Sequence, residues 1–295
     1  MNQPDDVRQA SVPAPVRVPF GQRLAAAMQE HGPLCMGIDP HAGLLAEWGL
    51  TDTAEGLETF SLRSLEAAAA EGVAAIKPQV ALYERHGSSG IAVLERLLGQ
   101  AREAEVLTIA DAKRGDIGST MAGYAEAWLS DGSPLAADAV TLSPYLGYES
   151  LRPAIDLAVQ KGRGVFVLAL TSNPEGASVQ HAGGADGSVA RSIARAAAAD
   201  NAQAGPDHLG PVGLVVGATV AEDAARLGLD LSTVGGALLA PGFGAQGATA
   251  HGMKTGFGQA WPHVVATSSR AILQAGPTIE GLREAIRRNR ADLAG

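Results

Sequence analysis

The chain has 295 residues, of which 46% are hydrophobic and 4% aromatic, and its formal net charge is -9. This length and apolar content suffice for one large core built mainly from aliphatic side chains, and an α/β barrel of this length is commonly a single domain. The acidic balance argues against a nucleic-acid backbone as partner, but it allows a small phosphorylated ligand held by a few local groups.

The single cysteine, Cys35, excludes an intrachain disulfide and a thiolate metal cluster. It lies in an apolar run, where a buried and inert thiol is expected. Residues 1–18 are polar and rich in proline, which predicts a disordered arm ahead of a folded domain at 19–295. Neither a signal peptide nor an apolar run long enough to cross a membrane is present, so we expect a cytoplasmic protein with no membrane partner.

Eight short apolar runs alternate with stretches of helical periodicity along the chain. Near-continuous apolar runs of this length suit parallel strands that are buried on both faces. The runs occupy 34–39, 73–79, 106–112, 138–144, 164–170, 212–218, 237–243 and 263–269, and clear helical segments include 54–72, 187–202 and 278–295. This alternation predicts a single-domain (β/α)8 TIM barrel, with an open doubly wound sheet as the alternative.

Charged residues stand at the ends of the first three apolar runs. Asp39 follows the first run, Lys77 lies near the end of the second, and the third leads into Asp111, Lys113 and Asp116. The carboxyl ends of barrel strands form the active site, and buried charges are costly unless paired, so five such residues at one rim favour a functional site. Residues i and i+2 of a strand share a face, which places Asp111 beside Lys113. Neighbouring carboxylates favour the ammonium form of lysine, which suits a general acid.

A loop with six glycines is predicted at 242–258, after the seventh run. Glycine-rich backbone approaches phosphate closely, and Arg270, one strand later, adds a bidentate donor. Barrels often bind phosphate at these two loops, so we interpret them as a phosphate site. The histidines show no metal-ligand spacing, and the lysines at the rim would repel a cation, so no metal site is predicted.

The stretch DAKRGDIGST at 111–120 resembles the D-x-K-x-x-D-I-x-x-T signature of the orotidine 5′-phosphate decarboxylase family. The segments TLSPYLGYES, TSNPEG, APGFGAQG and SSR resemble the longer bacterial branch of that family, and the likeness runs from about Leu34 to the C-terminal helix. The resemblance implies a (β/α)8 barrel that converts orotidine 5′-phosphate to UMP and CO2 in the last step of pyrimidine nucleotide synthesis. It also implies no cofactor and a homodimer with shared active sites.

The resemblance further implies roles for the residues of the signature. Lys113 resembles the proton donor to C6 of the pyrimidine, and Asp111 resembles the carboxylate set against the carboxylate of the substrate. Asp116 and Thr120 resemble residues that reach across the dimer interface to the ribose in the other subunit.

Residues outside the signature carry the other implied contacts. Asp39 and Lys77 resemble the ribose-binding pair, and the resemblance also implies a link between Lys77 and Asp111. Ser172 matches the position that reads the pyrimidine ring. Gln246 and Arg270 resemble the phosphate ligands.

Three other functions are compatible with parts of this pattern. The 3-keto-L-gulonate 6-phosphate decarboxylase type shares the Asp-x-Lys-x-x-Asp motif but uses Mg²⁺ and an enediolate. A Schiff-base aldolase would use Lys113 or Lys77, which requires a lysine of lowered pKa in an apolar pocket. A non-catalytic barrel would bind a phosphorylated ligand and turn nothing over.

Overall fold

Every predicted apolar run overlaps a strand in the computed structural model, which describes residues 17–205, 208–244 and 247–295, although β3 extends two residues beyond its run of 106–112. Short segments rich in aliphatic residues form strands here because both of their faces are covered. The strands are β1 (Leu34–Ile38), β2 (Ala75–Pro78), β3 (Ile109–Arg114), β4 (Ala139–Leu142), β5 (Gly164–Leu170), β6 (Val212–Val216), β7 (Leu238–Pro241) and β8 (Val264–Ser268).

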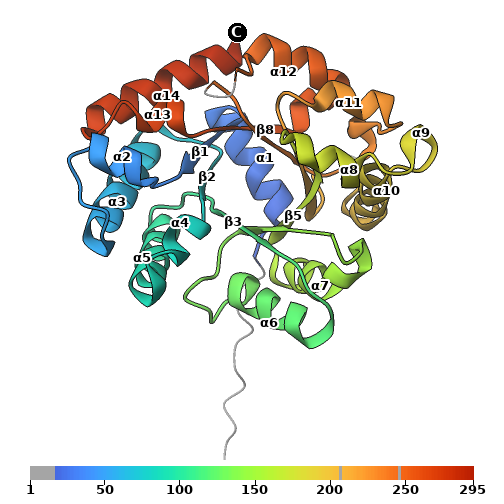
Figure 1. The fold of residues 1–295 in the computed structure, drawn as a ribbon, viewed down its shortest axis with the longest axis horizontal. Coiled ribbons are helices and arrows are strands. Elements are labelled where there is room, and N and C mark those ends of the chain that lie inside the picture. Colours follow the sequence, from blue (N-terminus) through green and yellow to red (C-terminus); the bar gives the residue numbers. More distant parts are fainter. Residues whose placement is uncertain (1–16, 206–207, 245–246) are drawn as a thin grey trace, which may run out of the picture.

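The strands form one parallel sheet that closes on itself. Its order is β2-β1-β8-β7-β6-β5-β4-β3, and every strand pair is parallel. Parallel bridges Ile76–Thr108 and Gln79–Asp111 join β2 to β3 and complete the circle. Figure 1 shows the strands at the centre with helices around them. The predicted (β/α)8 barrel is therefore confirmed, and the open doubly wound sheet is wrong.

Helices follow the strands and cover the outside of the barrel. The α-helices are α1 (Phe20–His31), α2 (Ala42–Glu47), α3 (Ala54–Glu71), α4 (Ala81–Glu84), α5 (Gly87–Glu103), α6 (Gly118–Leu129), α7 (Arg152–Lys161), α8 (Ala177–Gln180), α9 (Gly184–Gly187), α10 (Val189–Asn201), α11 (Ala221–Arg226), α12 (Ala250–Phe257), α13 (Arg270–Leu273) and α14 (Ile279–Ala294). Short 3-10 turns are η1 (Tyr148–Leu151), η2 (Pro174–Gly176), η3 (Ala202–Ala204), η4 (Leu231–Thr233) and η5 (Gly258–His263). The sequence predicted α3, α10 and α14 most clearly, and each begins at a side-chain cap. The hydroxyls of Thr53, Ser188 and Thr278 each accept a hydrogen bond from a backbone N–H of the first turn.

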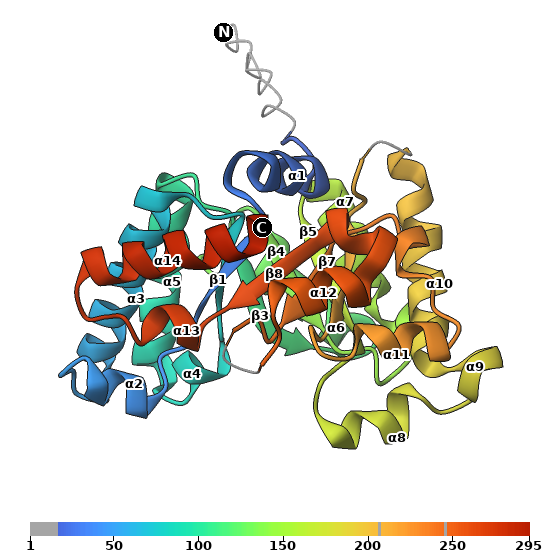
Figure 2. The same cartoon turned by 90° about the horizontal axis from the view of Figure 1, so that it is seen from above.

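Helix α1 lies across the amino-terminal end of the barrel (Figure 2). Its Phe20 and Leu24 belong to the same buried cluster as strand residues such as Cys35 and Phe166. The rings of Phe20 and Phe166 meet edge to face, with centroids 6.0 Å apart. This end of the barrel is thus filled by apolar packing, which leaves the carboxyl end of the strands for chemistry.

Two expectations about the amino-terminal region have different outcomes. Residues 1–16 of the predicted arm lie outside the described residues, whereas Arg17 donates to Asp131 at 2.9 Å. The Cys35 thiol is fully buried as expected, and burial raises its pKa to about 12.

Within the described ranges, none of the helices combines the length and apolar character needed to span a membrane.

The glycine-rich loop predicted at 242–258 is shorter than expected, because its second half is helix α12. Thr249 caps this helix by accepting the N–H of Gly252, and Met253 and Phe257 bury one helical face at a spacing of four residues. The glycine content masked this periodicity in the sequence. The loop that remains at the rim ends before Ala250.

We expect Phe20→Ala to lower the free energy of unfolding by about 3–5 kcal/mol, because it opens a cavity in the packed end of the barrel. Urea unfolding measures this effect. Val18→Ala is the control, because that side chain is 52% exposed and should change stability by less than about 0.5 kcal/mol. Equal stability of the two variants would contradict the packing role of α1.

Candidate active site

A cavity of about 400 Å³ opens at the carboxyl ends of the strands. Residues from β1, β2, β3, β5 and β8, or directly after them, point into it because parallel strands present their carboxyl ends at one rim. The predicted residues Asp39, Lys77, Asp111, Lys113, Ser172 and Arg270 all line it. The fold therefore brings together most of the side chains that the sequence singled out.

Asp111 lies at the centre of the charged group and is buried, with 7% of its surface exposed. Its Oδ1 accepts from Lys113 Nζ at 2.6 Å and from the Thr141 hydroxyl at 2.9 Å. Its Oδ2 accepts from Lys77 Nζ at 2.8 Å and from Gln79 Nε2 at 3.2 Å. The carboxylate is thus held by both ammonium groups and by two neutral donors on neighbouring strands.

The electrostatics of this group keep Asp111 and Lys77 charged. Burial raises the pKa of the Asp111 carboxyl, but the ammonium groups of Lys77 and Lys113 outweigh this and hold the pKa below its usual value. Burial also lowers the pKa of Lys77, but Asp111 and Asp39 outweigh it and hold that pKa above its usual value. The site therefore presents a carboxylate and a buried ammonium side by side at neutral pH.

The backbone of β3 is irregular where Lys113 enters the cavity. Lys113 has φ 48°, in the left-handed region, and the register between β3 and β4 shifts between Ala110 and Arg114. The Lys113 side chain nevertheless reaches Asp111, as the alternation of strand residues predicted. The first part of the signature motif, up to Arg114, therefore lies on a bulged strand, and the Lys113 side chain is about half exposed.

One end of the cavity has the features expected of an anion site. Gly242 and Phe243 after β7, and Ser269 and Arg270 after β8, line the same space. Gly244 has φ 80° and lies so close to α13 that an added Cβ would be 3.2 Å from Ala271. Gln246, the other predicted phosphate ligand, lies outside the described residues. The exposed Arg270 guanidinium and the glycine-containing loop after β7, which packs near α13, suit the binding of a phosphate.

Between this anion site and Lys77, at the end of β1, Asp39 offers an acceptor. Its Oδ1 atom is buried and has no hydrogen-bond partner among the described residues. A buried carboxylate oxygen is costly to leave unpaired, so a hydroxyl of a bound ligand is a natural partner. The ribose contact that the resemblance implied for Asp39 stays a prediction.

Asp116 and Thr120 do not line the cavity of their own chain. Asp116 Oδ1 accepts the backbone N–H of Ile117 at 2.8 Å, and Thr120 is exposed on α6. Their implied role in the other subunit is therefore not tested by a single chain.

Three residues that line the cavity or donate hydrogen bonds to Asp111 had no role predicted from the sequence. Gln79 and Thr141 both donate to Asp111, and His41 lines the cavity just before α2. Thr141 had a signal in the sequence, because a polar residue within a run buried on both faces requires a partner. Gln79 and His41 follow strand ends, which is a weaker signal.

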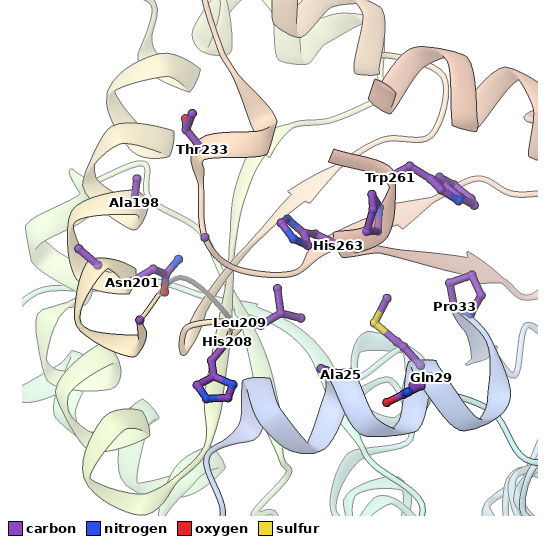
Figure 3. Close-up of a pocket in the computed structure, with 15 residues that line it drawn as sticks. Ala25, Gln29, Pro33, Ala198, Asn201, His208, Leu209, Thr233, Trp261 and His263 are labelled. Carbon is purple, nitrogen blue, oxygen red and sulfur yellow. The ribbon is translucent and has the colours of Figure 1, made fainter. Parts of the chain in front are cut away.

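A larger cavity, of about 780 Å³, lies at the other end of the barrel between α1, α10 and η5. Figure 3 shows His263 and Leu209 facing this space, with Gln29 on α1 beside it. None of the predicted site residues lines it. Size alone would therefore select the end of the barrel opposite to the one where the predicted site residues lie.

Among residues 17–205, 208–244 and 247–295, no three His, Cys, Asp or Glu side chains are grouped in a way suited to a metal ion. At Asp111, both carboxylate oxygens already accept from ammonium groups. A cation at that carboxylate would have to displace one of them.

The fold and this site define a (β/α)8-barrel protein with a Lys–Asp–Lys group at the carboxyl end of its strands, in which Lys77 and Asp111 are buried. The family model described as "Orotidine 5'-phosphate decarboxylase / HUMPS family" matches residues 32–285, and the chain belongs to this family. The orotidine 5′-phosphate decarboxylase of Streptomyces coelicolor is 55% identical over 268 residues, covering 90% of this chain and 94% of that protein. The one from Salinispora arenicola is 54% identical over 275 residues, covering 92% and 96%.

Solved structures agree with this assignment. A crystal structure from Streptomyces avermitilis, provisionally named orotidine 5′-phosphate decarboxylase, superposes with a TM-score of 0.90 at 52% identity and covers 97% of this chain and 98% of that one. The Leishmania donovani OMP decarboxylase superposes with a TM-score of 0.70 at 27% identity, covering 92% and 98%. The predicted family is therefore confirmed.

We expect Asp111→Asn to lower the free energy of unfolding by about 3 kcal/mol or more at pH 7, because it leaves the Lys77 ammonium buried without a counter-charge. The pKa of Asp111 is depressed on folding, so its contribution is present above the unfolded value near 4 and is lost as the pH falls through the folded value. The stability gap between native protein and variant should therefore narrow below about pH 4.

Urea unfolding at a series of pH values measures this gap. Asp52→Asn is the matched control, because Asp52 pairs with Arg85 at the surface and should cost less than about 1 kcal/mol. Equal losses in the two variants would show that Asp111 is not held as described.

Proposed function

We propose that the protein decarboxylates orotidine 5′-phosphate to UMP and CO2 without a cofactor. The names of its relatives support the decarboxylation, since they are called orotidine 5′-phosphate decarboxylases. The observation that carries this proposal is the Lys77–Asp111–Lys113 group at the mouth of the barrel, with hydrogen bonds of 2.8 and 2.6 Å. In this proposal, the reaction is the last step in the synthesis of UMP. The cytoplasmic location of the protein stays a prediction.

In this proposal, Lys113 performs the central chemical step. Loss of CO2 leaves a carbanion at C6 of the pyrimidine, with no adjacent carbonyl to delocalise the charge. A preorganised ammonium beside C6 stabilises that charge as it develops and then delivers a proton to the same atom. Lys113 suits this role because Asp111 holds its Nζ in place while the side chain remains open to the cavity.

Asp111 contributes through its charge. It stays ionised between two ammonium groups, so the carboxylate of the substrate enters beside a like charge. The repulsion between the two carboxylates destabilises the bound substrate relative to the transition state, because it is relieved as CO2 leaves.

Binding energy comes from parts of the substrate that do not react. Arg270 and the loop after β7 would hold the phosphate, Asp39 and Lys77 the ribose, and Ser172 the pyrimidine. Remote contacts of this kind position C6 against Lys113 and supply energy used at the reacting centre. Gln246 stays a predicted phosphate ligand.

The proposed partner is a second copy of this chain. Ile117, Tyr145 and Leu146 expose 62%, 79% and 53% of their surface, which is unusual for apolar side chains of this size. They lie on adjacent loops, because Ser143 N–H donates to Arg114 O at 2.7 Å between β3 and β4. Burial of this apolar surface in a homodimer would carry the neighbouring Asp116 towards the partner's cavity.

The alternatives fit these residues less well. A Schiff-base aldolase requires a lysine of lowered pKa, whereas the pKa of Lys77 is raised. The 3-keto-L-gulonate 6-phosphate decarboxylase type uses Mg²⁺, whereas both oxygens of Asp111 already accept from ammonium groups, one of which a cation at that carboxylate would have to displace. A binding protein without activity is distinguished by assay.

We expect Lys113→Ala to lose at least about 10³-fold in kcat, because it removes both the charge partner of the carbanion and the proton donor. The decrease in substrate absorbance at saturating orotidine 5′-phosphate measures kcat. Lys161→Ala is the control, since Lys161 is on α7 and pairs with Asp131 at the outer surface. A folded Lys113→Ala protein with near-native kcat would refute the role of Lys113.

We expect mixtures of inactive Lys113→Ala and Asp116→Ala proteins to regain activity. A hybrid dimer would contain one cavity with native Lys113 from one chain and native Asp116 from the other, so up to about a quarter of native activity should return after random exchange. Subunit exchange is followed with two affinity tags. Exchange without recovered activity would show that each site is built from one chain.

A further inference from the structure

We propose that Thr141 is a positioning residue that holds Lys113 in its reactive geometry. Thr141 lies on β4 next to the bulged part of β3, and its side chain is fully buried. This inference rests on the proposed function, because it assigns Thr141 a task through the ammonium of Lys113.

The Thr141 hydroxyl makes two hydrogen bonds to the catalytic strand. It donates to Asp111 Oδ1 at 2.9 Å and accepts the backbone N–H of Lys113 at 2.9 Å. A hydroxyl has one hydrogen and two lone pairs, so it can make both bonds at once. One atom therefore fixes both the carboxylate that holds the ammonium and the backbone from which that ammonium extends.

The backbone of Lys113 needs such support. A side chain other than glycine at φ 48° is strained, and strained residues persist only where their surroundings hold them. The β3–β4 ladder is interrupted between Ala110 and Arg114, so the Lys113 N–H bonds to a side-chain oxygen in that gap. Without the hydroxyl, this N–H would lose its partner and the bulge would be free to relax.

Relaxation of the bulge would change the position of the ammonium. Lys113 Nζ and the Thr141 hydroxyl share the same acceptor, Asp111 Oδ1, so loss of the hydroxyl leaves that oxygen held by Lys113 alone, while Lys77 and Gln79 still hold Oδ2. A displacement of about 1 Å at a reacting group commonly costs up to about 100-fold in rate. The proposed phosphate contact at Arg270 lies elsewhere in the cavity, and Lys77, which is proposed to hold the ribose, keeps its bond to Asp111 Oδ2, so substrate binding should be retained.

A purely structural role for Thr141 is the competing explanation, and Thr108 provides a matched control. Thr108 is buried at the other end of the same pair of strands. Its hydroxyl donates to Asp138 Oδ2 at 3.1 Å and accepts the Asp138 N–H at 3.0 Å. Thr108 thus makes the same two kinds of bond as Thr141, but away from the cavity.

The experiment compares Thr141→Val, Thr141→Ser and Thr108→Val by kcat, KM, UMP affinity and melting temperature. For Thr141→Val we expect kcat to fall by about 10- to 100-fold, with KM and the Kd for UMP changed less than about threefold. Thr141→Ser retains the hydroxyl and should recover kcat to within about threefold of native. Thr108→Val should lower the melting temperature about as much as Thr141→Val while keeping native kcat.

The inference is overturned if Thr141→Val keeps a kcat within about twofold of Thr108→Val, or if Thr141→Ser is as slow as Thr141→Val. If Thr141→Val does not fold, Thr141→Ala takes its place, because it also removes the hydroxyl. Lys113→Ala separates this result from the proposed function. An inactive Lys113→Ala with an active Thr141→Val rejects only the inference, whereas an active Lys113→Ala rejects the role of Lys113 itself.

Discussion

The interaction between Asp111 and its two lysines is the constraint on which the site depends. A carboxylate and an ammonium are both costly to bury, and they are stable here because each neutralises the other within hydrogen-bond distance. The three side chains come from β2 and β3, so the arrangement requires these strands to be neighbours. The β2–β3 bridges that complete the barrel therefore also assemble the charged group.

The two ends of the barrel divide stability from chemistry. At the amino-terminal end, α1 and the strand interiors form an apolar cluster around Phe166. At the carboxyl end, polar and charged groups face a cavity, and one residue of the catalytic strand has a strained backbone. Strain and buried charge are destabilising, so they depend on the packed remainder of the barrel. This division allows the loops at the rim to vary without loss of the fold.

Much of the fold was accessible from sequence because eight aliphatic runs leave few alternatives to a parallel barrel. The charged residues Asp39, Lys77, Asp111 and Lys113 were also accessible, because charges at the ends of buried strands need an explanation. Helix α12 was not accessible from the sequence. Its glycines are typical of a loop, and only Met253 and Phe257 mark its buried face. The bulge at Lys113 and the support from Thr141 depend on the pairing between two strands, which no local pattern encodes.

The most direct test of the account is an assay of the purified protein with orotidine 5′-phosphate in excess EDTA, followed by the decrease in substrate absorbance. The account attributes catalysis to the protein's own charged groups, so it predicts rapid and complete conversion to UMP, at a rate unchanged by added Mg²⁺. No conversion, or conversion only after a divalent cation is restored, would contradict it.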